Sequence, residues 1–583
     1  MKKLLRFLKD YKKECVLAPL FKMLEASFEL FVPLVMAAII DKGIARSDEP
    51  YIVKMSLIVI SLGLIGLVCS ITAQYFSAKA AVGFATKVRH SLFRHIESLD
   101  YSTLDKLGTS TLITRMTSDI NQAQSGVNMV LRLFLRSPFI VLGAMVMAFT
   151  VNVGAAMTFV VTIPLLSLVV FGVMGLSIPL YKKVQLGLDK VLNRTRENLT
   201  GVRVIRAFAM EDQEIEHFNK ENAELTGMSM HVGRISALMN PITYVIINLA
   251  TVYLIYIGAL KVDVGTLSQG DVVALVNYMS QILVELIKFA NFIVTVNKAL
   301  ASGNRIQSIF DVKPAFSRAD ISGDKSLDGH LIFDDKSGDY AIEFNKAGLA
   351  YIEGGDEALS NIDFKVKKGE TVGIIGGTGS GKSSIVNLIP RFYDATAGEV
   401  KVFGANVKDY VLDSLRQVIG DVPQKAVLFK GSIADNLRWG NSNATDEDLY
   451  KALDIAQARE FVDQKEGGLS FMLEQGGRNL SGGQRQRLTI ARALVRQPKI
   501  LILDDSSSAL DFATDLKLRT ALKDMGGDMT TVIVSQRTSS IKHADKIVVM
   551  DDGEIAGMGT HEELLKSCEI YKEIHESQFK GVE

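Results

Sequence analysis

A glycine-rich stretch between residues 371 and 384 contains the residue types that bind phosphate. It reads TVGIIGGTGSGKSS, an apolar strand followed by a turn and a helix start, and its centre fits the spacing G-x-x-x-x-G-K-S. Glycines allow backbone N–H groups to wrap around phosphate oxygens, the Lys382 amine reaches the terminal phosphates, and the Ser383 hydroxyl is a ligand for Mg²⁺. Every fixed position is filled, so a chance glycine-rich turn is disfavoured. The expected phosphate-binding residues are Gly376, Gly377, Thr378, Gly379, Ser380, Gly381, Lys382, Ser383 and Ser384.

A second apolar run, KILILD at residues 499–504, predicts a buried parallel strand that ends in the carboxylate of Asp504. Many apolar strands end in Asp, so this run alone is weak evidence. Beside a phosphate loop, however, Asp504 suits the second protein ligand of Mg²⁺ in an ATPase. The pair therefore indicates binding and cleavage of ATP.

The chain as a whole divides into two unlike halves. Its 583 residues are 48% apolar and 22% charged, and a mean hydropathy of +0.20 suits neither a soluble protein nor one wholly embedded in lipid. A membrane-spanning helix needs about 20 mostly apolar residues. Beyond residue 300 the apolar runs are only of strand length. Before it, the candidate spans are 15–40, 52–79, 128–150, 154–180, 235–260 and 271–297.

The charge and cysteine content exclude several other classes of protein. With 65 basic and 65 acidic side chains there is no broad basic field, so we expect no nucleic-acid partner. Cys15, Cys69 and Cys568 are odd in number and far apart, which excludes a disulfide framework and a cysteine zinc cluster.

The distribution of basic residues predicts the orientation in the membrane. Lys and Arg are frequent in the first 13 residues and in the long loops 80–127 and 181–234, whereas the short connection 151–153 is uncharged. Basic loops mark the cytoplasmic side, so both termini and everything after residue 300 should be cytoplasmic. The two long loops keep helical spacing, as in Ala80–Glu97 and Leu186–Glu224, so we expect the spans to continue beyond the bilayer as helices.

Ionisable residues inside the predicted spans mark either a pathway or an internal ion pair, because charge within a bilayer is costly. Lys22 with Glu25, and Glu285 with Lys288, are i,i+3 pairs that can neutralise each other. Glu29 lies one turn beyond Glu25 on the same face, which leaves one acid without a local partner. Structural and functional roles both stay open for Glu25 and Glu29. Arg132 and Arg136 are the cations of the third span, and Arg132 is expected to reach toward the interface.

Between the two nucleotide motifs the chain reads NLSGGQRQR at residues 479–487. This signature, placed between a G-x-x-x-x-G-K-S loop and a strand ending in Asp, resembles the ATP-binding cassette (ABC) transporters, and the six spans with long helical loops resemble their exporter half-transporters. The resemblance implies an all-α six-helix transmembrane domain (1–310), a linker (311–339) and an α/β P-loop NTPase domain, the ABC nucleotide-binding domain (340–583). It also implies a multi-pass protein of a bacterial plasma membrane that takes ATP and Mg²⁺.

The resemblance assigns further site residues by motif position. Tyr351 matches the aromatic residue that stacks on adenine, and Gln424 matches the glutamine that touches Mg²⁺ and senses the membrane domain. The stretch Ser508–Asp511 matches the loop that crosses between two cassettes. In the family the signature faces the γ-phosphate of ATP held by a second cassette, so the working unit should be a dimer. The signature residues are Leu480, Ser481, Gly482, Gly483 and Gln484, and Asp511 completes the set.

The chain departs from the family at the positions that handle water. Asp505 stands where hydrolytic sites have a glutamate, and its carboxylate is one methylene, about 1.5 Å, further back. Gln536 replaces the switch histidine, and an amide cannot carry charge or relay a proton as imidazole does. Ser506-Ser507 and Gln475 are further departures. The pattern resembles the degenerate subunit of a heterodimeric, multidrug-type exporter, whose intact signature completes the partner's hydrolytic site.

Residues 100–105 resemble the first coupling helix of such exporters, and residues 201–208 resemble the second long loop, with the second coupling helix expected somewhat downstream. The leading hypothesis is therefore a subunit of an ATP-driven exporter of amphipathic, drug-like or lipid-like small molecules, paired with a different half-transporter chain in the lipid bilayer. Two alternatives remain. One is a homodimeric exporter with two slow sites, and the other is a regulatory ATP-binding membrane subunit without transport of its own.

Overall fold

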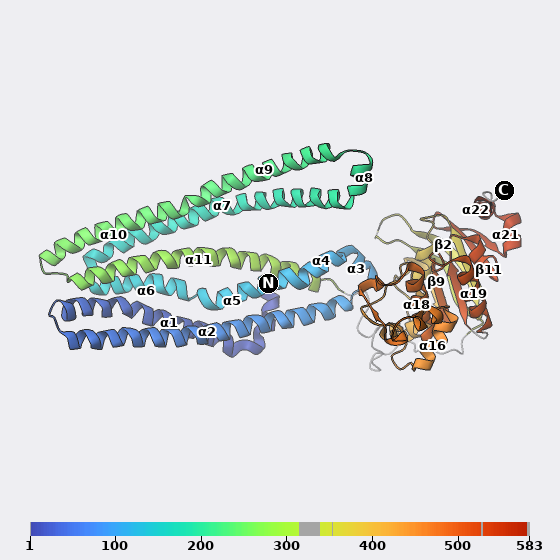
Figure 1. Cartoon of the computed structure of the whole chain (residues 1–583), viewed down its shortest axis with the longest axis horizontal. Coiled ribbons are helices and arrows are strands. Elements are labelled where there is room, and N and C mark those ends of the chain that lie inside the picture. The colour runs from blue at the N-terminus through green and yellow to red at the C-terminus, as the bar shows by residue number, and fades with distance from the viewer. Residues whose placement is uncertain (1, 314–337, 353, 526–528, 580–583) are drawn as a thin grey trace. The chain divides into compact units, whose positions relative to one another are not determined.

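The computed structural model describes residues 2–313, 338–352, 354–525 and 529–579. The chain forms two compact units, one of residues 1–95 and 110–312 and the other of residues 96–109 and 313–583. Figure 1 shows the long helices of the first unit and the mixed α/β fold of the second. Most of the expected linker, residues 314–337, lies outside the described residues.

The first unit confirms the six predicted spans. Six helical segments of 42 to 53 residues are long and apolar enough to cross a membrane. A bilayer needs only about 20 residues of helix, so each segment continues well beyond it, as the loop spacing predicted. Their elements are η1 (Lys2–Tyr11), α1 (Lys12–Ala38), η2 (Ile39–Ile44), α2 (Glu49–Glu97), α4 (Thr109–Thr114), η3 (Arg115–Asp119), α5 (Ile120–Leu133), α6 (Arg136–Val151), α7 (Val153–Thr200), α8 (Val202–Ala207), α9 (Glu211–Ala237), α10 (Met239–Asp263) and α11 (Gln269–Phe310).

Small residues and buried hydroxyls hold these helices together. The α7 helix runs beside α9 and α10, and α11 runs beside α5 and α6 (Figure 1). Gly126 of α5 faces Ala299 of α11, and a side chain at Gly126 would overlap it, so the small residues allow close approach of the two helices. The fully buried Tyr278 of α11 donates a hydrogen bond to the backbone oxygen of Leu30 of α1 (2.7 Å).

Two interruptions differ from the predicted pattern. The third span breaks between α5 and α6 at residues 134–135, next to Pro138, which has no backbone N–H to donate within a helix. The second interruption lies in the stretch Leu186–Glu224, where helical spacing was expected throughout. There Gly201 and the left-handed Ala209 (φ +52°) bound the short helix α8, and the long α9 follows. The second coupling helix, expected somewhat downstream of residue 208, stays a prediction.

The second unit is built on a six-stranded sheet in the order β12-β11-β3-β10-β9-β6. All neighbouring strands are parallel except the edge pair β11 and β12. Ile502 of β9 packs in one hydrophobic cluster, while Leu501 and Leu503 pack in the other, so the sheet is covered on both faces. The strands are β3 (Thr371–Gly376), β6 (Ile419–Val422), β9 (Ile500–Asp504), β10 (Thr530–Val534), β11 (Lys546–Asp551) and β12 (Glu554–Gly559).

A second, antiparallel sheet has the order β2-β1-β4-β5, and β7 pairs with β8. Its strands are β1 (Tyr340–Leu349), β2 (Leu359–Lys367), β4 (Ala397–Val402) and β5 (Ala405–Asn406), and the small pair is β7 (Gly431–Ser432) with β8 (Met472–Leu473). The helices of this unit are α3 (Tyr101–Leu107), α13 (Lys382–Leu388), α14 (Leu412–Gln417), α15 (Ile433–Arg438), α16 (Asp446–Ile455), α17 (Arg459–Asp463), η4 (Gly468–Ser470), η5 (Gln475–Gly477), α18 (Gly482–Val495), α19 (Phe512–Asp524), α20 (Thr538–Ile541), α21 (His561–Ser567) and α22 (Glu569–Phe579).

Candidate nucleotide-binding site

Four neighbouring parallel strands bring the predicted site residues to one edge of the sheet. The strands β3, β10, β9 and β6 lie side by side, and their carboxyl ends are followed by the glycine-rich loop, Gln536, Asp505 and Gln424 respectively. In open parallel sheets, ligands bind outside the carboxyl ends of the strands. The topology therefore gathers residues that are far apart in the sequence.

The glycine-rich loop needs its glycines for backbone conformation and for close packing. Gly379 and Gly381 have φ angles of +86° and +92°, a region that favours glycine. A Cβ at Gly376 would meet the Met550 carbonyl and the Ser380 hydroxyl, whereas a Cβ at Gly377 or Gly379 would project into open space. The loop is thus packed on one side and open on the other, which suits a cradle for phosphate.

Lys382, the first residue of α13, is buried and held against this loop. Its ammonium group donates hydrogen bonds to the backbone oxygens of Gly376 (3.0 Å) and Gly377 (2.5 Å) and lies 3.3 Å from the Ser380 hydroxyl. Burial lowers the pKa of Lys382, while the nearby Asp505 and Asp504 oppose that shift. A bound polyphosphate would place further negative charge beside this buried cation. The residues present therefore fit a polyphosphate.

A cavity of about 330 Å³ opens beside the loop. Tyr351 lies at its margin with 39% of its surface exposed, and its hydroxyl is 2.8 Å from the Ser384 hydroxyl. The cavity brings together most of the residues predicted from the sequence. Its lining consists of Tyr351, Ala358, Thr378, Gly379, Gly381, Lys382, Ser383, Ser384, Gln424, Asp504, Asp505, Val534, Ser535 and Gln536.

Three oxygen-bearing side chains in the cavity are of the kind that Mg²⁺ prefers. Ser383 donates a hydrogen bond to Oδ1 of Asp504 at the end of β9 (3.2 Å), as expected for a hydroxyl and a carboxylate that share a metal. Burial raises the pKa of Asp504, and the Asp505 carboxylate adds to the shift. A divalent cation there would offset both effects. Ser383, Asp504 and Gln424 would hold the ion.

Asp505 and Gln536, the two residues that depart from the family pattern, both line this cavity. Asp505 has a left-handed backbone (φ +43°), and its N–H bonds to the Val534 carbonyl of β10 (3.0 Å). Gln424 donates a hydrogen bond to Oδ2 of Asp505 (3.2 Å). The side chain predicted to position water is thus engaged by the glutamine predicted to touch Mg²⁺.

The signature residues, Leu480–Gln484, do not line this cavity. Ser481 starts α18 with a capping box, in which its hydroxyl accepts the N–H of Gln484 and the Gln484 side chain accepts the N–H of Ser481 (3.3 and 3.0 Å). Ser481 is exposed, so the amino end of α18 is open to an anion from outside this chain's own loop.

Asp511 has a structural role in this chain, as the N-cap of α19. It caps α19 by accepting hydrogen bonds from the backbone N–H and the hydroxyl of Thr514 (2.9 and 2.8 Å), and these bonds lower its pKa. The loop before it packs against the signature, because a Cβ at Gly483 would lie 3.0 Å from the Ala509 carbonyl.

The first expected coupling segment is a short helix, α3, which belongs to the same compact unit as the cassette. The Tyr101 ring lies 4.6 Å from the Phe392 ring, and Tyr393 donates a hydrogen bond to Oδ2 of Asp105 (2.6 Å). The Tyr393 ring also packs edge-on against Tyr351 of the nucleotide cavity (5.0 Å between centroids). No sequence motif singles out Tyr393, and the only signal for it is its place shortly after α13, the helix that follows the phosphate loop.

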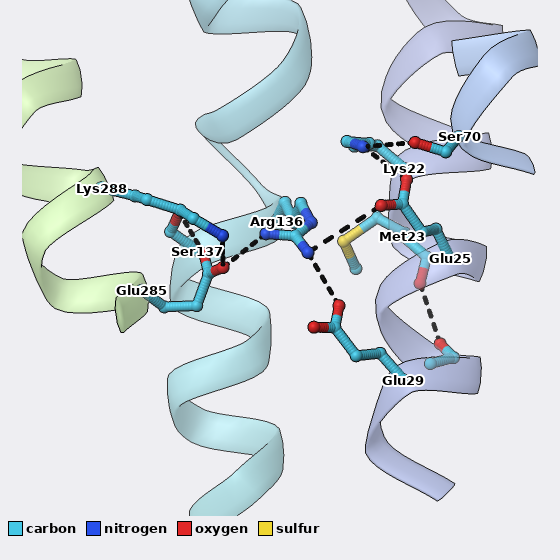
Figure 2. A network of polar contacts seen from close by, with 10 residues as sticks. Lys22, Met23, Glu25, Glu29, Ser70, Arg136, Ser137, Glu285 and Lys288 are labelled. Carbon is cyan, nitrogen blue, oxygen red and sulfur yellow. Dashed lines mark hydrogen bonds and ion pairs between the residues drawn. The ribbon is translucent and has the colours of Figure 1, made fainter. Parts of the chain in front are cut away.

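The intramembrane charges form one network across α1, α6 and α11 (Figure 2). Arg136 of α6 lies between the helices, 2.5 Å from Oε1 of Glu285 and 2.7 Å from Oε2 of Glu29. Both predicted i,i+3 pairs form: Lys22 with Glu25 (2.5 Å) and Lys288 with Glu285 (2.8 Å). The acid that lacked a local partner, Glu29, is paired by Arg136 of another span. The sequence contained both charges but not their proximity.

Comparison with known proteins places these features in a family. The "Uncharacterized ABC transporter ATP-binding protein YfiB" of Bacillus subtilis is 36% identical over 579 residues, and the match covers 99% of each chain. The chain belongs to the ABC transporter family. Two family models match it, the ABC transporter transmembrane region at residues 15–286 and the ABC transporter model at residues 359–508.

Other ABC proteins are similar over most of the chain. The "ATP-dependent lipid A-core flippase" of Hahella chejuensis is 32% identical, and the match covers 88% of this chain and 85% of the flippase. The solved structure of a bacterial Atm1-family ABC exporter with ATP bound has a TM-score of 0.78 at 20% identity and covers 98% of this chain and 99% of that one, which establishes the shared fold. With six spans and one cassette in a single chain, the protein is an ABC exporter half-transporter.

Proposed function

We propose that the chain is one subunit of a heterodimeric ATP-driven exporter, that it binds ATP at a weakened site, and that its signature completes the hydrolytic site of a different half-transporter. The observation that carries the proposal is the asymmetry within the cavity. The residues expected to hold ATP and Mg²⁺ surround it, while the two positions expected to handle water are Asp505 and Gln536.

The geometry of Asp505 supports weak hydrolysis. Its carboxylate is about 1.5 Å further back than that of a glutamate, and misplacement of about 1 Å can cost a hundredfold in rate. Oδ2 is already bonded to Gln424, which reduces its capacity to orient water. Gln536 can donate a hydrogen bond to a γ-phosphate, but its amide cannot accept a proton at neutral pH.

The exposed amino end of α18 supports the proposed pairing. The exposed Ser481, the two glycines that follow it and the backbone N–H groups of those glycines, at the start of the helix, suit an external phosphate. Since these residues lie outside the chain's own cavity, ATP bound by a second cassette is the ligand proposed for them. The second cassette's own signature would in turn cover Lys382.

The proposed cargo is an amphipathic small molecule of drug-like or lipid-like type, moved outward across a bacterial plasma membrane with the cassette in the cytoplasm. The relative named for lipid A-core flipping supports a lipid-like cargo. Movement of the cargo would be coupled to ATP binding and hydrolysis through α3, which contacts the cassette at Tyr393 and Phe392.

The test is a co-purified complex of this chain and its partner half-transporter, reconstituted in vesicles. The proposal predicts ATP-dependent flux that is abolished when the partner's catalytic glutamate becomes Gln and largely retained after Asp505→Asn. Equal loss of turnover from the two changes would overturn the degenerate-site assignment. Absence of flux with full ATP hydrolysis would overturn the transport assignment.

A homodimer is the second candidate, and the observation that favours it is that one chain carries both a complete phosphate loop and a complete signature. Two copies would then form two identical slow sites. Robust ATP hydrolysis by the chain purified alone, lost after Ser481→Arg, would select this alternative.

A further inference from the structure

A cavity of about 470 Å³ lies between α1 and α11, beside the intramembrane charge network. The α1 residues that line it are Glu29, Val32, Pro33 and Met36, and the α11 residues are Asn277, Ser280, Gln281, Val284, Glu285 and Lys288. On each helix these residues recur at spacings of three and four, so each helix presents one continuous face. The cavity is therefore formed by regular helix faces and not by a loop.

The lining is mixed in a way that suits an amphipathic ligand. Val32, Pro33, Met36 and Val284 supply an apolar wall, while amides, a hydroxyl and charged groups supply the rest. Oε1 of Gln281 is buried and finds no hydrogen-bond donor among the residues that the structure describes. Buried polar atoms are normally satisfied, so Gln281 is a polar residue of the lining whose side-chain oxygen is not already committed to a partner among these residues.

The charged side chains at the cavity differ in their exposure and in the number of partners that they already have. The Glu285 carboxylate is only 3% exposed and receives bonds from Arg136, Lys288 and Ser137. By contrast, the side chains of Glu29 and Lys288 are 42% and 46% exposed, and each has one ion-pair partner in the network. Glu29 and Lys288 are thus the charged groups that a ligand can reach.

The network as a whole is electrically balanced. Its carboxylates are Glu25, Glu29 and Glu285, and its cations are Lys22, Arg136 and Lys288 (Figure 2). A ligand with a net charge would leave that charge uncompensated in a region of low dielectric constant, at a high cost. A ligand with one positive and one negative group adds no net charge, and it meets an accessible carboxylate on α1 and an accessible ammonium on α11.

We propose that this cavity binds the headgroup of a zwitterionic amphiphile, with the cationic group at Glu29, the anionic group at Lys288 and the apolar body against Val32, Pro33 and Val284. The proposal deepens the export function by naming a class of substrate, and it rests on that function only for the movement that follows binding. Binding itself requires neither ATP nor a hydrolytic site.

The test measures binding to the purified full-length protein without nucleotide. Three fluorescent amphiphiles with identical acyl chains serve as probes: a phosphocholine (zwitterionic), a phosphatidic acid (anionic) and a trimethylammonium lipid (cationic). The wild-type protein should bind the phosphocholine most tightly. Lys288→Gln should shift the preference toward the cationic probe and Glu29→Gln toward the anionic probe, each by roughly tenfold in the ratio of dissociation constants. The double variant should prefer the phosphocholine again, though more weakly.

Matched controls are Glu197→Gln and Lys220→Gln, which alter exposed charges of the cytoplasmic extensions and should leave all three affinities unchanged. A purely structural role for Glu29 and Lys288 predicts equal weakening for every probe in both variants, and that result would overturn the proposal. Unchanged affinities throughout would also overturn it, because they would mean that the probes only partition into the micelle. Failure of the export proposal would appear as absent flux with these binding preferences intact.

Discussion

Gln424 donates a hydrogen bond from Nε2 to Oδ2 of Asp505, across 3.2 Å. The bond joins the loop after β6 to the end of β9, two strands that are neighbours in the sheet. It engages the proposed water-positioning carboxylate with the residue proposed to contact Mg²⁺. The bond therefore joins, within the proposed nucleotide site, the side chain proposed to position water and the side chain proposed to contact Mg²⁺.

Removing the lysine of the phosphate loop should abolish tight nucleotide binding. Lys382→Ala removes a buried cation, and hydrogen bonds between charged groups contribute about 1.5–3 kcal/mol, which corresponds to roughly ten- to hundredfold in affinity. The measurement is the dissociation constant of a fluorescent ATP analogue with Mg²⁺. Lys566→Ala, an exposed lysine on α21, is the control and should bind normally. Unchanged affinity for Lys382→Ala would place the nucleotide elsewhere.

Deleting the Tyr393 hydroxyl should uncouple α3 from the cassette. Tyr393→Phe keeps the ring contact with Tyr351 but loses the bond to Asp105, and one hydrogen bond contributes about 1 kcal/mol, or roughly fivefold in coupling. We expect normal nucleotide binding and lower transport per ATP hydrolysed in vesicles of the complex. Asp105→Asn retains an acceptor oxygen and should be milder than Asp105→Ala. Identical behaviour of the three variants and the wild type would exclude a coupling role.

Replacing Arg136 should destabilise the membrane unit. Arg136→Met leaves Glu29 without its ion pair and removes one partner of the buried Glu285, and loss of one member of a buried charge cluster costs about 3–5 kcal/mol. A fall in the thermal unfolding midpoint of the purified protein would report it. Arg196→Met, on an exposed face of α7, is the matched control. Equal midpoints for the two variants would mean that the network contributes nothing to stability.

The cassette should become more stable in mild acid because of Asp421 on β6. Burial, together with the Asp504 charge, raises the pKa of Asp421 to about 6, and Arg492 opposes the shift only partly. The native state then binds a proton that the unfolded state releases, so the stabilising contribution grows as the pH falls from about 7 toward 4 and amounts to roughly 2–3 kcal/mol. Thermal unfolding at pH 5 and pH 7 should show about half of this gain, roughly 1.3 kcal/mol, in the wild-type protein and a smaller gain in Asp421→Asn. A gain of the same size in both would assign the effect to other groups.

The sequence predicted those parts of the protein that depend on local patterns. Six apolar runs, the phosphate loop and the strand ending in Asp504 each occupy a continuous stretch, and their period or spacing carries the information. The expectation that a buried parallel strand brings Asp504 beside the phosphate loop is met, whereas the order of β3, β10, β9 and β6 comes from the structure alone. Pairings between distant residues were not predictable, because nothing in the spacing of Arg136 and Glu29, or of Tyr393 and Asp105, encodes their contact. The break around the short helix α8 was also missed, because the helical spacing of Leu186–Glu224 gives no sign of the left-handed backbone at Ala209.

The central claim, that Asp505 and Gln536 weaken this chain's own site, is tested most directly by restoring the missing groups. ATP hydrolysis is measured for the complex with the partner half-transporter, whose catalytic glutamate is replaced by Gln, with this chain as the wild type and as the double variant Asp505→Glu/Gln536→His. The longer carboxylate and the imidazole should raise the rate at least about tenfold, given the roughly hundredfold cost of a 1 Å error. A wild-type rate that the double variant does not exceed, and that Asp505→Asn abolishes, would contradict the account.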